Sequence, residues 1–128
     1  MIGAGVHAIM LSPAVVTAID GTRPASLSPA VIGFLRKELG FEGTIITDDL
    51  DARSILRDSD LGAVAVEALA AGADLLLVGE ERATECAAAI ATAAEAGVLQ
   101  PERLQRAAAN VRRLARAVAR SGRGAHGR

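Results

Sequence analysis

Three short apolar runs, each followed by a segment with helical features, most constrain the fold of this chain. The runs span residues 6–11, 44–47 and 74–78 and consist largely of Val, Ile and Leu. Their length and aliphatic content are typical of buried strands. Strands that alternate with helices form a parallel sheet covered by helices. The sequence therefore predicts an α/β fold.

Capping residues mark the boundaries of the predicted helices. Ser28 and Pro29 suit the N-cap and the first helical position, and Gly40 suits the end of the same helix. Three further helices follow, at residues 61–72, 81–96 and from Pro101 onward. Residues 121–128, which read SGRGAHGR, are predicted to be a disordered tail.

Charge is distributed unevenly along the 128 residues. Residues 1–102 carry all fifteen acidic residues and six of the fourteen basic ones, whereas residues 103–128 carry eight arginines and no acid. The arginines alternate with apolar residues at helical spacing, which favours a solvated helix face. A nucleic-acid-binding arm is the alternative interpretation. The chain has two Phe and no Trp or Tyr, which argues against a stacking platform for single-stranded nucleic acid.

The cysteine content and the apolar runs indicate the class of protein. Cys86 is the single cysteine, so an internal disulfide is excluded, and its Ala-rich surroundings are typical of a packed helix. No signal-peptide pattern opens the sequence, and no apolar run reaches the roughly 18 residues of a membrane span. We therefore expect a cytoplasmic protein that does not bind membranes.

Acidic residues directly follow the second predicted strand. Asp48, Asp49 and Asp51 lie where a parallel sheet has the carboxyl ends of its strands, with Ser12 and Glu80 after the neighbouring strands. Ligands of α/β sheets bind at these ends. The acids are therefore candidates for a catalytic carboxylate, although solubility or helix capping also accounts for them.

Three segments carry specific motifs in a characteristic order. They read AGVHAIMLS…AIDGTRPASLSP, LRKELGFEGTIITDDLDARSI and EALAAGADLLLVG. The second matches the pattern LR…LGF.G.I.[ST]DDL.M, except that Ala52 replaces the Met. In this order and spacing the motifs resemble glycoside hydrolase family 3, and within it the NagZ-like β-N-acetylhexosaminidases. The resemblance covers about residues 2–119.

The resemblance implies a fold that is larger than this chain. The family folds as a TIM-like (β/α)₈ barrel of ~250 residues or more. Residues 1–120 would supply its last three β/α units, with parallel strands covered by helices, and a terminal helix. Three strands leave two open sheet edges. These edges would pair with the missing N-terminal half-barrel or with a second copy of the chain in a homodimer.

The resemblance also implies a reaction and residue roles. The family hydrolyses glycosides with retention through a covalent glycosyl-enzyme intermediate. Its nucleophile corresponds to Asp48, and Met10 and Ser12 would line the substrate site. The implied partner is an N-acetylglucosamine-containing glycan, as in peptidoglycan turnover, with no cofactor, metal ion or nucleic acid. Asp49 and Asp51 are expected to have structural roles.

The acid/base residues that the resemblance implies are absent from this sequence. In NagZ-like enzymes a His supported by an Asp protonates the leaving group, from a loop that would precede these units. His7 begins the first strand, away from the carboxyl ends, and His126 lies in the predicted tail. We therefore expect the chain alone to be inactive. A non-catalytic half-barrel module that pairs with another chain is the alternative.

Overall fold

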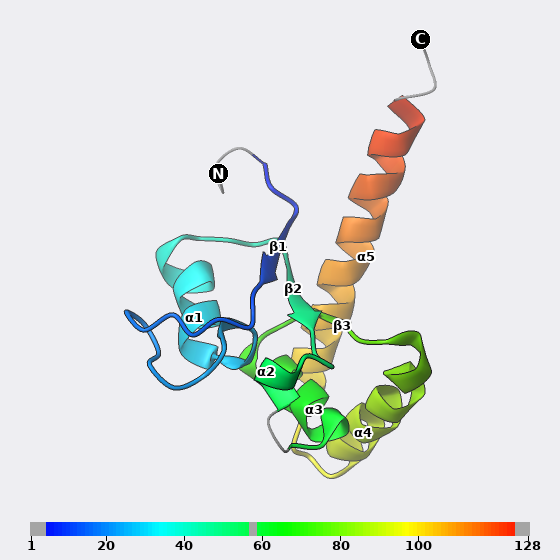
Figure 1. The fold of residues 1–128 in the computed structure, drawn as a ribbon. Coiled ribbons are helices and arrows are strands. Elements are labelled where there is room, and N and C mark those ends of the chain that lie inside the picture. The colour runs from blue at the N-terminus through cyan, green and yellow to red at the C-terminus, as the bar shows by residue number, and fades with distance from the viewer. Residues whose placement is uncertain (1–4, 57–58, 125–128) are drawn as a thin grey trace.

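The structure, a computed structural model, describes residues 5–56 and 59–124 (Figure 1). Its elements in chain order are β1 (Ala8–Leu11), the 3₁₀ turn η2 (Ala25–Leu27), α1 (Pro29–Gly33), the π-helical turn η3 (Phe34–Glu38), β2 (Thr44–Asp49), α2 (Arg53–Leu56), α3 (Leu61–Ala71), β3 (Leu75–Leu77), the 3₁₀ turn η4 (Glu80–Arg82), α4 (Ala83–Glu95) and α5 (Pro101–Gly124). The predicted alternation of strands and helices is confirmed.

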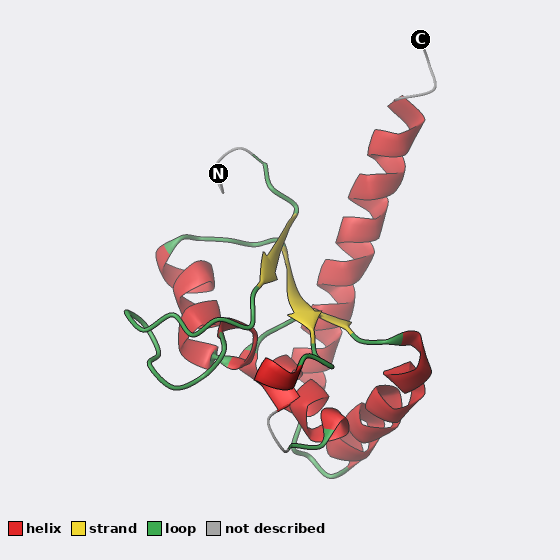
Figure 2. Ribbon diagram, in the orientation of Figure 1, coloured by secondary structure: helices red, strands yellow, loops and turns green. Residues whose placement is uncertain are grey.

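The three strands form one parallel sheet in the order β1-β2-β3 (Figure 2). The middle strand, β2, pairs with β1 in regular register from Ala8 opposite Thr44 to Leu11 opposite Thr47. The predicted mixed α/β class with a parallel sheet is therefore confirmed.

The core lies between one side of the sheet and the helices that follow the strands. Ile45, the second residue of β2, is fully buried together with Leu61 and Ala65 of α3. Complete burial of an Ile or Leu side chain stabilises the fold by roughly 1.5–3 kcal/mol. A second cluster joins α3, α4 and the start of α5 around Leu69 and Leu99. The first of these clusters packs β2 against α3.

Large apolar residues remain exposed on the strands. Met10 of β1 is 55% exposed, and Leu75 and Leu77 of β3 are 37% and 45% exposed. Side chains of this size are normally buried where a sheet is covered on both faces. The helices of the described residues therefore leave part of the sheet uncovered.

A buried carboxylate, Asp74, joins the amino ends of β2 and β3 to two helical segments. Its oxygens accept hydrogen bonds from Arg36 at 2.7 Å and from Arg103 at 2.6 Å. They also accept from the backbone N–H of Ile45 at 3.0 Å and from the side-chain amide of Asn110 at 3.1 Å. Asp74 thus fixes η3 and α5 against the strand that carries Asp48.

The helix boundaries agree with the capping residues, with two differences. The Ser28 hydroxyl accepts the backbone N–H of Val31 at 3.1 Å as the N-cap of α1, and Gly40 has a φ of 65° that suits glycine. The helix after Ser28 continues as a π-helical turn, which the periodicity did not predict. The tail predicted from residue 121 is wrong for residues 121–124, because α5 continues through Gly124. The Ser121 hydroxyl donates to the carbonyl of Ala117 at 3.1 Å within this last turn.

Candidate active site

Asp48 lies near the carboxyl end of the middle strand, β2. The arrowhead that marks this end of β2 points downward in Figure 1. Thr44, Ile45 and Thr47 precede it and are buried, whereas Asp48 is partly exposed and Asp49 is exposed. The side chain of Asp48 is therefore placed where a rigid strand reaches solvent. A catalytic carboxylate needs this combination of fixed position and access to substrate.

A bulge in β2 lies beside Asp48. Ile46 is opposite Leu75 and Asp49 is opposite Leu77, so β2 contains one residue more than β3 over this stretch. The hydroxyl of Thr47 accepts the backbone N–H of Leu77 at 3.0 Å. Bulges of this kind occur beside active sites, because they redirect the side chains that follow.

Two of the three acids are held in local turns. The backbone N–H of Asp49 donates to Oδ1 of Asp48 at 2.7 Å, and the backbone N–H of Asp51 donates to Oδ1 of Asp49 at 2.9 Å. These contacts satisfy donors that β2 leaves free where it ends. Among the described residues, no hydrogen bond to Oδ2 of Asp48 is formed, which leaves that oxygen available to a ligand.

Asp51 has a different environment, because it joins the loops that follow β2 and β3. Its Oδ2 accepts the backbone N–H of Gly79 at 2.7 Å, and its Oδ1 lies 3.4 Å from Nη1 of Arg82. Arg82 also forms a 2.9 Å ion pair with Glu85. Hydrogen bonding within this pair raises the pKa of Arg82 and lowers the pKa of Glu85. Asp51 therefore supports the loop beyond Asp48.

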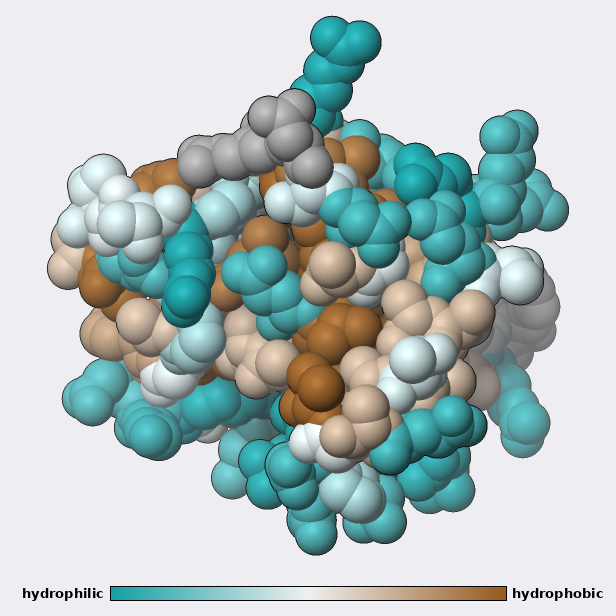
Figure 3. Space-filling model, turned by 90° about the horizontal axis from the view of Figure 1, so that it is seen from below, coloured by the Kyte–Doolittle hydropathy of each residue, from teal (hydrophilic) through white to brown (hydrophobic). Residues whose placement is uncertain are grey.

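A hollow of about 440 Å³ opens beside this loop, and its lining includes Asp51, Glu80 and Glu81. Figure 3 views the molecule from the side toward which the strands run. Apolar side chains gather in the middle of this face, and hydrophilic ones surround them (Figure 3).

The two predicted substrate-lining residues lie on the neighbouring strand at the same end of the sheet. Met10 is opposite Ile46 and is 55% exposed. Ser12 directly follows β1 and is exposed, and its hydroxyl accepts the backbone N–H of Ala14 at 3.1 Å. Because Leu11 is opposite Thr47, the next residue on each strand brings Ser12 to the level of Asp48.

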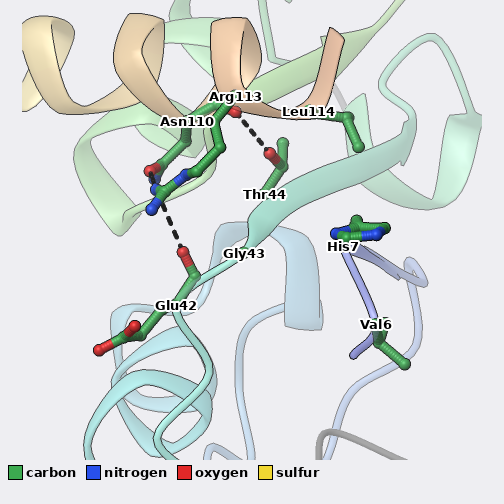
Figure 4. A pocket seen from close by; sticks show the side chains of 8 residues that line it. All are labelled: Val6, His7, Glu42, Gly43, Thr44, Asn110, Arg113 and Leu114. Atoms are coloured by element: carbon green, nitrogen blue, oxygen red, sulfur yellow. Dashed lines mark hydrogen bonds between the residues drawn. The ribbon is translucent and has the colours of Figure 1, made fainter. Parts of the chain in front are cut away.

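A second hollow lies at the opposite end of the sheet (Figure 4). Its volume is about 180 Å³, and its walls include His7 on one side and Asn110 and Arg113 of α5 on the other. Arg113 donates to the carbonyl of Glu42 at 3.3 Å and to the side-chain oxygen of Asn110. His7 is exposed here, at the amino end of β1 and away from the carboxyl ends of the strands. His126 lies outside the described residues.

Other side chains that could carry chemistry have structural environments. Cys86 is buried in α4, and burial raises the pKa of its thiol. Within residues 5–56 and 59–124, no group of three or more His, Cys, Asp or Glu could hold a metal ion. No helix in the same part of the chain is long and apolar enough to cross a bilayer.

The family of the chain follows from a comparison with known protein families. The model of the glycosyl hydrolase family 3 N-terminal domain matches residues 1–114. The chain belongs to glycoside hydrolase family 3. Its three β/α units are therefore part of a family 3 N-terminal domain.

Solved structures of family 3 enzymes have the same fold. The β-N-acetylglucosaminidase of Paenibacillus sp. str. FPU-7 superposes with a TM-score of 0.82 and 35% identity, over 88% of this chain and 22% of that chain. The β-N-acetylhexosaminidase of Beutenbergia cavernae superposes with a TM-score of 0.74 and 32% identity, over 91% of this chain and 34% of that chain.

Curated family 3 relatives agree with these structures. A β-hexosaminidase of Idiomarina loihiensis is 38% identical over 51% of this chain and 24% of its own length. A protein of Arthroderma benhamiae described as a secreted glycosyl hydrolase is 40% identical over 63% of this chain and 23% of its own length. The chain thus spans about a quarter of the curated family 3 proteins that it matches.

Proposed function

We propose that this chain supplies the nucleophile half of a family 3 active site that hydrolyses N-acetylglucosaminides, as in peptidoglycan turnover. The observation that carries the proposal is the position of Asp48. It is the second-last residue of the central strand, it lies within the family motif, and it is partly exposed beside a bulge. The proposed placement of the chain is the last three β/α units of the barrel.

The proposed reaction requires a carboxylate nucleophile and a separate acid/base group, for which the resemblance implies a His supported by an Asp. A carboxylate oxygen of Asp48 attacks the anomeric carbon while an acid on another segment protonates the departing glycosidic oxygen, so the old C–O bond breaks as the glycosyl ester forms. Water then attacks the anomeric carbon with that same group acting as base, which releases the sugar and restores the carboxylate. Met10 and Ser12 would contact the sugar from the next strand. Because the second group is missing from this sequence, we propose that the chain alone is inactive.

A chimera tests the role of Asp48 directly. These 128 residues would replace the matching segment of the Paenibacillus enzyme, and hydrolysis of an aryl N-acetylglucosaminide would be measured. The isolated chain should show no hydrolysis, and the chimera should be active. Asp48→Asn should lower kcat of the chimera by at least about 10³-fold, the order expected for loss of a nucleophile.

Asp49→Asn is the matched control, because it removes one carboxylate from the next position. It should leave kcat within about tenfold of the unsubstituted chimera, which is far less than the loss expected for the nucleophile. If the two variants lose activity equally, or if Asp48→Asn stays active, the proposed role is wrong.

The exposed apolar surface supports a second candidate function, a half-barrel module that pairs with another copy. Besides Met10, Leu75 and Leu77 on the strands, a groove of about 580 Å³ runs between β3, α4 and α5, and apolar residues such as Ile90, Leu104 and Val111 line it. Sedimentation would show a stable dimer, and calorimetry would show no N-acetylglucosamine binding, if this is the function. A monomer in solution would contradict it.

A further inference from the structure

The exposed face of α5 carries a row of arginines that the proposed active site does not use. Six arginines of this helix are exposed, and they are Arg106, Arg112, Arg113, Arg116, Arg120 and Arg123. At 3.6 residues per turn they occupy a sector about 120° wide. The buried residues of the helix, Ala107, Asn110 and Ala117, occupy the adjacent sector. We refer to these six residues as the arginine face.

Little inside the molecule neutralises the arginine face. Residues 103–124 contain no acidic side chain. The ion pairs formed among the described residues involve Arg36, Arg82 and Arg103, and none involves the arginine face. Arginines three and four residues apart on a helix repel one another. The face is therefore electrostatically unfavourable until an external anion binds it.

The arginine face is also well placed to bind a large partner. The second half of α5 stands clear of the sheet and of the other helices (Figure 1). It extends toward the side of the amino ends of the strands, away from the end that carries Asp48 (Figure 1). A polymer bound along this half of the helix would leave the candidate active site open.

The guanidinium groups of the arginine face are suited to bind phosphate groups. Arg116, Arg120 and Arg123 follow one another along the helix axis over roughly 10 Å, at about 1.5 Å per residue. Guanidinium groups bind phosphate oxygens through two parallel hydrogen bonds. A row of such groups therefore matches a row of phosphates along a polymer.

Two other occupants fit the face less well. Insertion into a bilayer needs bulky apolar anchors, whereas the projecting part of α5 offers Ala117, Val118 and Ala119. A second copy of the chain would offer its acids, but these are distributed over both shorter and longer helices, β2 and the loops between them, and form no comparable row along one helix.

We propose that the arginine face binds a linear phosphodiester polymer that is part of, or attached to, the glycan on which the enzyme acts. The choice of a phosphate-bearing glycan polymer over nucleic acid rests on the proposed function, because a hydrolase of N-acetylglucosaminides works among glycans. The arginine face would hold the polymer at one end of the molecule while the active site at the other end acts on sugar.

Fluorescence polarisation of the full chain with a labelled glycerol-phosphate oligomer tests the proposal. With four phosphate contacts, the affinity should fall roughly 50-fold between 50 and 200 mM salt. The triple variant R116Q/R120Q/R123Q should weaken binding at least about tenfold, because three of those contacts are lost. Gln has nearly the helix propensity of Arg, so circular dichroism should show that α5 remains helical.

A matched control removes the same charge elsewhere. The variant R23Q/K37Q/R53Q also deletes three exposed cations, and it should change the affinity by less than about threefold because these residues lie outside the row. Equal losses in the two variants would show an effect of net charge alone and would overturn the proposal. Tighter binding to a short DNA duplex, tighter binding to phosphatidylglycerol vesicles, or no binding to any of the three would also overturn it.

The test separates this proposal from the proposed hydrolysis. The Asp48→Asn variant should bind the oligomer as tightly as the unsubstituted chain. Loss of binding in the arginine variant is measured without any substrate turnover, so the outcome does not depend on whether Asp48 is the nucleophile.

Discussion

Asp74 is the residue whose substitution should most destabilise the framework of the site. Its side chain has no exposed surface, whereas Arg36 and Arg103 beside it are 24% and 16% exposed. Asn has the same shape as Asp, but in the Asp74→Asn variant an amide NH₂ group replaces one carboxylate oxygen and faces a hydrogen-bond donor. Both arginines then also lose their negative partner.

The size of this effect can be worked out from the contacts. Removing one partner from a buried ion pair costs about 3–5 kcal/mol, because a charge is left buried without compensation. The arginines here keep some contact with solvent, so we expect the lower end, about 3 kcal/mol. A change of this size should lower Tm by roughly 10 °C in a domain of this length. It is also a large part of the ~5–15 kcal/mol total that is typical of a folded domain.

Urea unfolding followed by circular dichroism measures the free energy of unfolding of the unsubstituted chain and of the Asp74→Asn variant. Glu67→Gln is the control, because Glu67 is exposed on α3 and its substitution should change the free energy of unfolding by less than about 0.5 kcal/mol. If Asp74→Asn lowers the free energy of unfolding by less than 1 kcal/mol, and the dependence of that free energy on urea concentration is unchanged, the carboxylate does not stabilise the strand ends and our reasoning is wrong.

Two further predictions concern the loop after β1 and the turn after α3. Hydrogen bonds, chiefly from the Ser28 hydroxyl, lower the pKa of Asp20 to about 2. The contribution of the ionised Asp20 to stability is therefore complete above pH ~4 and is lost as pH falls toward 2. Urea unfolding at several pH values should show that Asp20→Asn loses less stability over this range than the unsubstituted chain. Identical pH profiles of the two proteins would contradict the prediction. Gly72→Ala should destabilise the fold by about 1–3 kcal/mol, because Gly72 has a φ of 120° and a new Cβ would lie 2.7 Å from Ile32. Gly33→Ala is the control, because Gly33 lies in a helix with open space at the Cβ position, and it should be neutral or stabilising by up to ~1 kcal/mol. Equal unfolding midpoints for Gly72→Ala and Gly33→Ala would show that the positive φ and the crowding at Gly72 do not matter.

Local features of the fold were predictable because local chemistry determines them. The aliphatic runs around Ile45 and Leu76 form parallel strands, and Ser28 caps the helix that follows the first strand. Cys86 is buried, as its Ala-rich surroundings indicated. Each of these features depends on neighbours within one element or one turn.

Features that depend on distant partners were not predictable. Asp74 reads in the sequence as the first residue of a strand, and its role does not show there because its partners lie up to 38 positions away. The bulge between Ile46 and Asp49 depends on how β3 docks, and the Thr47 hydroxyl bond appears only then. The extension of α5 through Gly124 was not predictable, because Gly122 and Gly124 disfavour helix.

For the candidate site, the motif selected Asp48 and the fold explains its surroundings. Position in the sequence alone does not separate Asp48, Asp49 and Asp51, whereas the contacts show that Asp51 joins two loops and Asp49 closes a turn. The resemblance implies that the acid/base group lies on a segment outside these residues, so their pattern and contacts do not locate it.

The most direct test of the account is covalent trapping of the nucleophile. The active chimera would be treated with an activated 5-fluoro-N-acetylglucosaminyl fluoride, which forms the glycosyl ester quickly and releases it slowly, and the modified peptide would be sequenced by mass spectrometry. We predict one added sugar per molecule, attached to Asp48, and no adduct in the Asp48→Asn variant. An adduct on Asp49, Asp51 or any other residue would contradict the central claim.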